Sequence, residues 1–294
     1  MATEGGIRLV RGMIPRRSKI GVLIGIWIGG VGVFSLAAEL PTLGEKKWLG
    51  HFIGFENKKF SYGFTVQGKS FFKVVGAKDQ PLSTKLAVQV DFVVQEILPS
   101  GKTYERLILP QSLQSSQPAG NHPKNVIIRG KVKGDASFEI SVDEDRGVIS
   151  LGGHLIDKGT LVNNPVRFLI RVKFPNAYPY TKRDGDKERK EAFKEKIKND
   201  RMWLTWTDGK RVKPATDKVL DVCSKDINGP GISGLQVEFS PYDGKKIECV
   251  ASVNSVIALS SGQAGPLHDG FVVNWVMDSA KDPAGQARLN ISVR

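Results

Sequence analysis

The uncharged segment 20–38 constrains the chain more than any other feature of its sequence. It runs for 19 residues without a charged side chain, and Arg16, Arg17 and Lys19 stand just before it. A basic start, an apolar run and an exit through small residues form the pattern of a secretory signal, which is removed after export. The pattern therefore predicts that the rest of the protein is extracytoplasmic, either periplasmic or secreted.

Small residues at the end of this segment mark where the signal would be cut. Cleavage after Ala37 fits best and cleavage after Ala38 comes next, so 1–38 is predicted to be the export signal. The alternative is a single-pass membrane anchor that is retained, because about 20 apolar residues are enough to cross a bilayer. The glycines of the segment, Gly25 and Gly29 among them, weaken it as a stable helix. We expect contact with a membrane only if the segment is retained.

The charge of the remaining chain favours anionic partners. Residues 39–294 hold 38 of the 43 Lys and Arg residues and 29 of the 30 Asp and Glu residues, which leaves a net charge of +9. A basic protein attracts acidic glycans or other anionic surfaces. Because the charge is spread along the chain, the sequence lacks the clustered basic patch of a nucleic-acid-binding protein. The expected partners are an anionic glycan or an envelope protein, and nucleic acid is not expected.

Alternation of apolar and polar residues runs through most of the chain and is typical of β-strands. Phe60, Tyr62 and Phe64 alternate with smaller residues, which places three rings on one face of a strand. The segment 166–174 alternates in the same way and is the most regular amphipathic strand in the sequence. Twelve to fifteen such short runs are separated by turn residues. The expected fold is mainly β, with one or two β-sandwiches.

A charge-dense stretch, 182–201, interrupts the strands and is the only segment with a clear helical pattern. Its acidic and basic residues lie three or four positions apart, as on a solvated helix. We predict a β-sandwich-like domain over 39–181, a charged helix or linker over 182–201, and a smaller β-rich domain over 202–294. A single larger sandwich with a helical insertion is the alternative.

The sequence contains none of the common catalytic motifs. It lacks Gly-x-Ser-x-Gly, His-Glu-x-x-His and a phosphate-binding glycine loop, and its four histidines are not spaced as metal ligands. The acidic run 143–145 could hold calcium, but consecutive side chains of a strand point to opposite faces, which favours an exposed turn. The sequence thus predicts no catalytic residue, no metal and no cofactor.

Trp203 is the strongest candidate for a ligand-binding residue. On a strand its ring shares a face with Thr205, whereas Met202 and Leu204 face the core. An exposed ring among polar neighbours can stack on a sugar or on a partner. Two further residues, Tyr178 and Tyr180, could extend this aromatic surface. The alternative is that the adjacent charged helix covers Trp203, since tryptophan is usually largely buried.

The chain has two cysteines, Cys223 and Cys249, and both follow the predicted signal. An oxidising compartment permits a disulfide between them. The alternative is two separate buried thiols, because spacing alone does not determine geometry.

These observations favour an exported, non-catalytic binding or structural module of the cell envelope, which recognises acidic glycans or a protein partner. One alternative is a glycan-active hydrolase on a β-sandwich scaffold, which requires a cleft with paired Asp or Glu residues. Another is a membrane-tethered component of an envelope assembly, which requires an exposed apolar patch or an open strand edge.

Overall fold

The computed structural model describes residues 46–77, 82–117, 123–178, 187–262 and 264–294. The predicted export signal at 1–38 lies outside the described residues. The described residues all belong to one compact unit that extends from 40 to 294. No helix among them has the length and apolar character needed to cross a membrane.

The protein is mainly β, as the alternation predicts, and its elements follow one another through short turns. In the first half of the chain the strands are β1 (His51–Glu56), β2 (Phe60–Thr65), β3 (Ser70–Val74), β4 (Val88–Ile97), β5 (Thr103–Arg106), β6 (Gln114–Ser115), β7 (Val126–Lys131), β8 (Ser137–Asp145), β9 (Val148–Asp157) and β10 (Val166–Phe174). Single 3-10 turns occupy Lys46–Trp48, Thr84–Leu86 and Pro110–Ser112.

In the described part of the second half lie the two α-helices and the remaining strands. In order these are α1 (Lys187–Ile197), β11 (Arg201–Trp206), β12 (Arg211–Val212), α2 (Lys225–Asn228), β13 (Ile232–Glu238), β14 (Ile247–Ala251), β15 (Ser255–Ser260), β16 (Phe271–Met277) and β17 (Leu289–Val293), with 3-10 turns at Ser240–Tyr242 and Leu267–Asp269. The predicted charged helix is confirmed as α1, and the short helix α2 was not foreseen.

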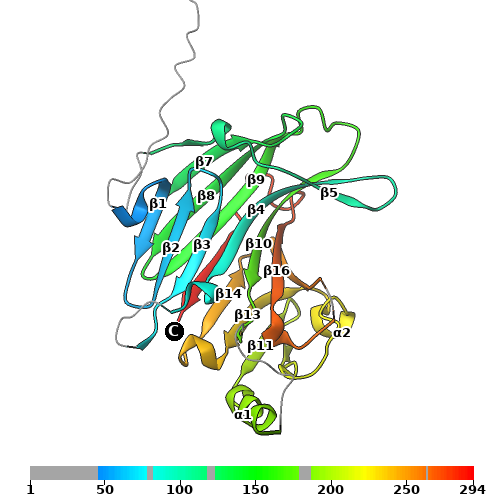
Figure 1. Cartoon of the computed structure of the whole chain (residues 1–294). Coiled ribbons are helices and arrows are strands. Elements are labelled where there is room, and N and C mark those ends of the chain that lie inside the picture. The colour runs from blue at the N-terminus through cyan, green and yellow to red at the C-terminus, as the bar shows by residue number, and fades with distance from the viewer. Residues whose placement is uncertain (1–45, 78–81, 118–122, 179–186, 263) are drawn as a thin grey trace, which may run out of the picture. The chain divides into compact units, whose positions relative to one another are not determined.

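The strands form two layers of one antiparallel sheet. Ladder hydrogen bonds link β1, β2, β3, β4, β10, β16 and β15 in the first layer. They link β11, β13, β14, β17, β9, β8, β7 and β6 in the second layer. The layers are joined where Ile232 of β13 pairs with Ile257 of β15. Figure 1 shows β7, β8 and β9 running behind β1 to β4.

Strand pairing also joins segments from both sides of 182–201. Strand β10 pairs with β16 over six residue pairs, and β9 pairs with β17 over four. The predicted division into 39–181, 182–201 and 202–294 remains a prediction, because pairing between strands does not by itself define domains.

Aspartate–glycine turns connect two pairs of strands in the second half of the chain. Asp208 and Gly209 connect β11 to β12, and Gly209 has a φ of +87° that glycine adopts without strain. Asp243 and Gly244 lie between β13 and β14 with φ values of +57° and +71°. Positive φ is tolerated by Asp and favoured by Gly, so both loops close tightly.

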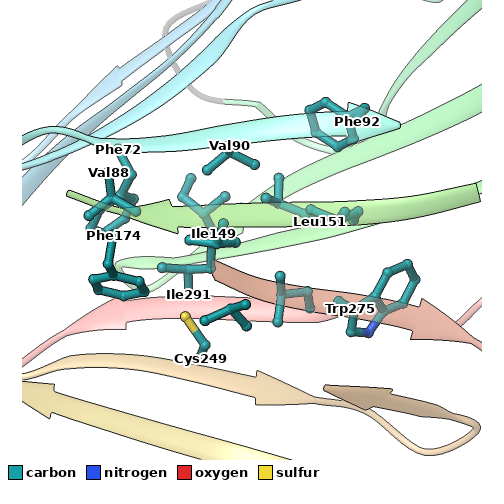
Figure 2. Close-up of a cluster of buried hydrophobic side chains, with 14 of the residues drawn as sticks. Phe72, Val88, Val90, Phe92, Ile149, Leu151, Phe174, Cys249, Trp275 and Ile291 are labelled. Carbon is teal, nitrogen blue, oxygen red and sulfur yellow. The ribbon is translucent and has the colours of Figure 1, made fainter. Parts of the chain in front are cut away.

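Side chains from both layers meet in one core, and part of it is shown in Figure 2. A chain of rings crosses it: Phe92 lies 6.4 Å from Phe168, and Phe168 lies 6.1 Å from Phe138. Phe92 and Phe168 belong to the first layer, and Phe138 belongs to the second. A Cβ atom at Gly153 of β9 would come within 2.4 Å of the Phe168 ring. The ring therefore packs directly on the backbone of the opposite layer.

The two cysteines are not paired, so the predicted disulfide is absent from this structure. Cys249 faces the core from β14, while Cys223 is exposed just before α2. Burial raises the pKa of the Cys249 thiol to about 12. With one thiol exposed and the other buried, Cys223 is the thiol that reagents can reach in the native protein.

We therefore expect a thiol-specific reagent to modify about one cysteine in the native protein, because only accessible thiolates react. After unfolding, the reagent should modify about two. A Cys223→Ser variant should lose the native reaction. Titration with a chromogenic disulfide reagent counts the reactive thiols in each state. If neither cysteine reacts in unfolded protein that has not been reduced, the two form a disulfide.

Replacing Phe168 by Ala should lower the free energy of unfolding by about 3–5 kcal/mol, because the change leaves a cavity between the two layers. The exposed Tyr104 offers a matched control, and Tyr104→Ala should change stability by no more than about 0.5 kcal/mol. Urea unfolding measures the free energy of unfolding of both variants. Equal decreases for Phe168→Ala and Tyr104→Ala would contradict a special role for the Phe168 ring between the layers.

Candidate functional site

The structure places Trp203 on β11 with its ring half-buried. Met202 and Leu204 on either side are fully buried, so the ring is on the outer face of the second layer. Trp203 pairs across the ladder with Gln236 of β13. The ammonium of Lys213 lies 5.7 Å from the ring centroid, within the range of a cation–π contact.

Tyr178 does not belong to this aromatic surface, because its side chain is buried. Its ring meets Phe193 and His268 edge-on, at centroid distances of 5.4 and 5.7 Å. Its hydroxyl donates to the Asp200 carboxylate, 3.0 and 2.9 Å from the two oxygens. The other predicted partner, Tyr180, lies outside the described residues.

Asp200 is a buried carboxylate that connects three elements near Trp203. Besides Tyr178 it accepts the backbone N–H of Ser240 at 2.8 Å, and the Ser240 hydroxyl lies 2.9 Å from the same oxygen. That hydroxyl is also 2.8 Å from the carbonyl of Lys196 in α1. Burial and the Asp200 charge raise the pKa of Tyr178, which keeps its hydroxyl protonated as a donor. The network fixes the loop after β13 against the end of α1.

A cavity of about 520 Å³ opens beside this network. It is lined by Asn199, Arg201, Glu238, Phe239, Ser240, Asp243 and Gly244. Arg201 pairs with Glu238 across the β11–β13 ladder. This pair lies two residues along the strands from the pair of Trp203 and Gln236, and therefore on the same face. Because same-face residues of a strand are about 7 Å apart, the cavity and the ring are neighbours on one face.

The charged groups of the cavity are held by specific partners. The Arg201 guanidinium donates to the carbonyls of Lys198 and Asp200 at 2.6 and 2.7 Å. Glu238 forms an ion pair with Lys246 at 3.7 Å. Asp243 accepts the backbone N–H of Ala77. The site therefore offers fixed donors and acceptors beside a ring, an arrangement suited to binding hydroxyl groups.

Sequence reasoning found Trp203 and missed the residues of the cavity. Arg201 could have been found, because it lies two positions before Trp203 and so shares its face. Glu238 and Asp243 could not, because their proximity to Arg201 depends on the pairing of β11 with β13. Among the described residues, no three His, Cys, Asp or Glu side chains are grouped as metal ligands.

Removing the Asp200 carboxylate should destabilise the protein. Asp200→Ala leaves the buried Tyr178 hydroxyl with only the Lys196 carbonyl as acceptor, at 3.3 Å, and takes the acceptor from the part-buried Ser240 N–H. A loss of about 2–4 kcal/mol in unfolding free energy is expected. Asp217, which is exposed, provides the control, and Asp217→Ala should be nearly neutral. Chemical unfolding followed by tryptophan fluorescence checks the pair; a neutral Asp200→Ala would mean that water replaces the carboxylate.

Comparison with known proteins identifies no family for the chain. No protein-family model matches it, and no curated protein matches its sequence. Among solved structures, the ligand-free alpha-N-acetylgalactosaminidase NagBb of Bifidobacterium bifidum aligns with 82% of this chain at 12% identity and a TM-score of 0.47. The Slr1438 protein of Synechocystis aligns with 87% at 11% identity and a TM-score of 0.38, over 96% of its own length.

The alignment covers only part of the glycosidase. The chain spans 35% of the NagBb chain in the ligand-free form and 36% in the complex with Gal-NHAc-DNJ, where the TM-score is 0.48. The β-sandwich assignment of this protein therefore rests on its own strand pairing, and the chain is similar to part of a glycosidase only at these low values.

Proposed function

We propose that this protein is an exported, non-catalytic module of the cell envelope that binds acidic glycans on the outer face of β11 and β13. The observation that carries the proposal is the half-buried ring of Trp203 next to a polar cavity of about 520 Å³. A sugar presents an apolar face of C–H groups and a rim of hydroxyls. A ring beside fixed donors and acceptors complements both.

Cations around the cavity support a preference for acidic glycans. Arg201 lines it, Lys246 pairs with Glu238 at its rim, and Lys213 lies against the Trp203 ring. The net charge of +9 on residues 39–294 supports the same class of ligand. Export is supported by the sequence pattern of 1–38 alone.

The engagement of the carboxylates supports binding rather than hydrolysis. Glu238 is paired with Lys246, and Asp243 accepts a backbone N–H, so neither is held as a free acid or base in a glycosidase pair. The hydrolase on a β-sandwich scaffold stays a prediction. Release of new reducing ends from a bound glycan would establish it.

One observation favours a membrane-tethered assembly component as a second candidate. Leu107, which follows β5, is 73% exposed, and Val162, between β9 and β10, is 65% exposed. In the described part of the chain β5 pairs only with β4, which leaves a strand edge open. A monomer at all concentrations in sedimentation experiments would argue against this candidate.

We expect the purified protein to bind polygalacturonate, with an affinity that falls steeply as salt is added, because the ligand and the site carry opposite charges. Trp203→Ala should weaken this binding about tenfold, or about 1.4 kcal/mol, through loss of the ring contact. Calorimetry at low and high salt, with neutral dextran and DNA as comparison ligands, measures the effect.

The matched control is Trp48→Ala. The Trp48 ring also lies beside a lysine, with the Lys47 ammonium 5.6 Å from its centroid, but it packs over β1 and β2. This variant should bind like the unmodified protein. Equal loss in both variants, or no binding to any glycan, would refute the proposed site.

A further inference from the structure

We infer that the protein has a second binding site, specific for the carboxylate of an acidic sugar, in a groove on the outer face of β6, β7, β8 and β9. The groove has a volume of about 760 Å³, within the range of small-molecule pockets. Its charged and polar lining includes Arg129, Lys131, Glu139 and His154. None of these residues belongs to the site beside Trp203, so the inference stands without the proposed function.

Four polar side chains cross the groove in a single row. The strand register pairs Gln114 with Arg129, Arg129 with Glu139, and Glu139 with His154. Cβ atoms of directly paired residues in an antiparallel sheet are about 4.5–5.5 Å apart. Phe138, the neighbour of Glu139 in β8, is fully buried, so Glu139 and the rest of the row are on the outer face. The row is therefore built by the pairing of four strands.

Glu139 holds the guanidinium of Arg129 in place. Arg129 Nε lies 2.9 Å from Glu139 Oε2, and the two side chains are 69% and 19% exposed. Within the described ranges, no other hydrogen bond to this guanidinium is found, which leaves its two terminal amino groups available. A guanidinium presents paired N–H groups that match the two oxygens of a carboxylate.

The groove has an excess of positive charge. Arg129 and Lys131 line it together with one carboxylate, Glu139, which is already paired. Lys131 is exposed, and no ion pair to it is found in the part of the chain that the structure describes. An anion is therefore the ligand that complements the lining.

His154 supplies a further hydrogen-bonding group. A Cβ atom at Gly285 would come within 2.6 Å of its Nδ1 atom, so this edge of the ring packs against the turn before β17. Gly285 has a φ of +64°, which favours glycine there. The other ring nitrogen, Nε2, is then the one left for the groove. An imidazole nitrogen can bond a sugar hydroxyl as donor or acceptor.

The lining also has an apolar part, because Ile156 is 51% exposed and lies beside His154. The complementary ligand has one carboxylate for Arg129, several hydroxyls for Gln114 and His154, and a face of C–H groups for Ile156. A hexuronic acid unit has these three features together.

Titration with methyl glucuronoside, followed by NMR, tests the inference, and methyl glucoside is the matched neutral ligand. The uronide should shift the Arg129 Nε–H and His154 ring signals, and the glucoside should bind at least tenfold more weakly. Equal affinities for the two ligands would overturn the inference. So would shifts confined to the Trp203 indole, since they would place the uronide at the other site.

Variants separate recognition from folding. Arg129→Gln should weaken uronide binding at least tenfold. Arg129→Lys keeps the positive charge but lacks the paired N–H donors of the guanidinium, so it should give an intermediate affinity. Lys124→Gln is the control, because Lys124 is exposed and pairs with Asp145 outside the groove. Circular dichroism establishes that each variant is folded, and unchanged binding by folded Arg129→Gln would refute the site.

Discussion

The contact between the Phe168 ring and the backbone of β9 is the constraint on which the two-layer arrangement depends. A side chain at Gly153 would occupy the space that the ring fills, since a Cβ atom there would be 2.4 Å away. The ring then reaches Phe92 in its own layer and Phe138 in the other. Dense packing of this kind fixes how the layers lie against each other, because a filled interior does not permit them to slide.

This packing determines where the functional groups can be. Strand residues alternate between faces, so every side chain that fills the core places its neighbours on the outside. In β8 the burial of Phe138 and Ile140 leaves Glu139 outside, and in β11 the burial of Met202 and Leu204 does the same for Trp203. The site beside Trp203 and the groove around Arg129 are therefore on the same outer face of the second layer.

Alternation explains how much the sequence could predict. The burial of Phe60, Tyr62 and Phe64 and the outward position of Trp203 follow from a period of two, which needs only local information. The burial of Tyr178 could not be predicted in this way, because the residue follows β10 in an irregular segment and is held by Asp200. The Arg129–Glu139–His154 row likewise depends on pairing between strands, which periodicity does not contain.

The groove around Arg129 differs in its charge balance from the ion pairs on the outer face of the first layer. On the first layer Arg171 pairs with Glu105 at 2.5 Å and Lys173 pairs with Asp91 at 2.6 Å. Hydrogen bonding to Arg171 lowers the pKa of Glu105, as expected for a carboxylate held in such a pair. In the groove of the second layer, Arg129 has one carboxylate partner and keeps most of its side chain in solvent. Lys131 lines the same groove without an ion pair among the described residues, so its lining keeps a net positive charge that the first-layer pairs do not have.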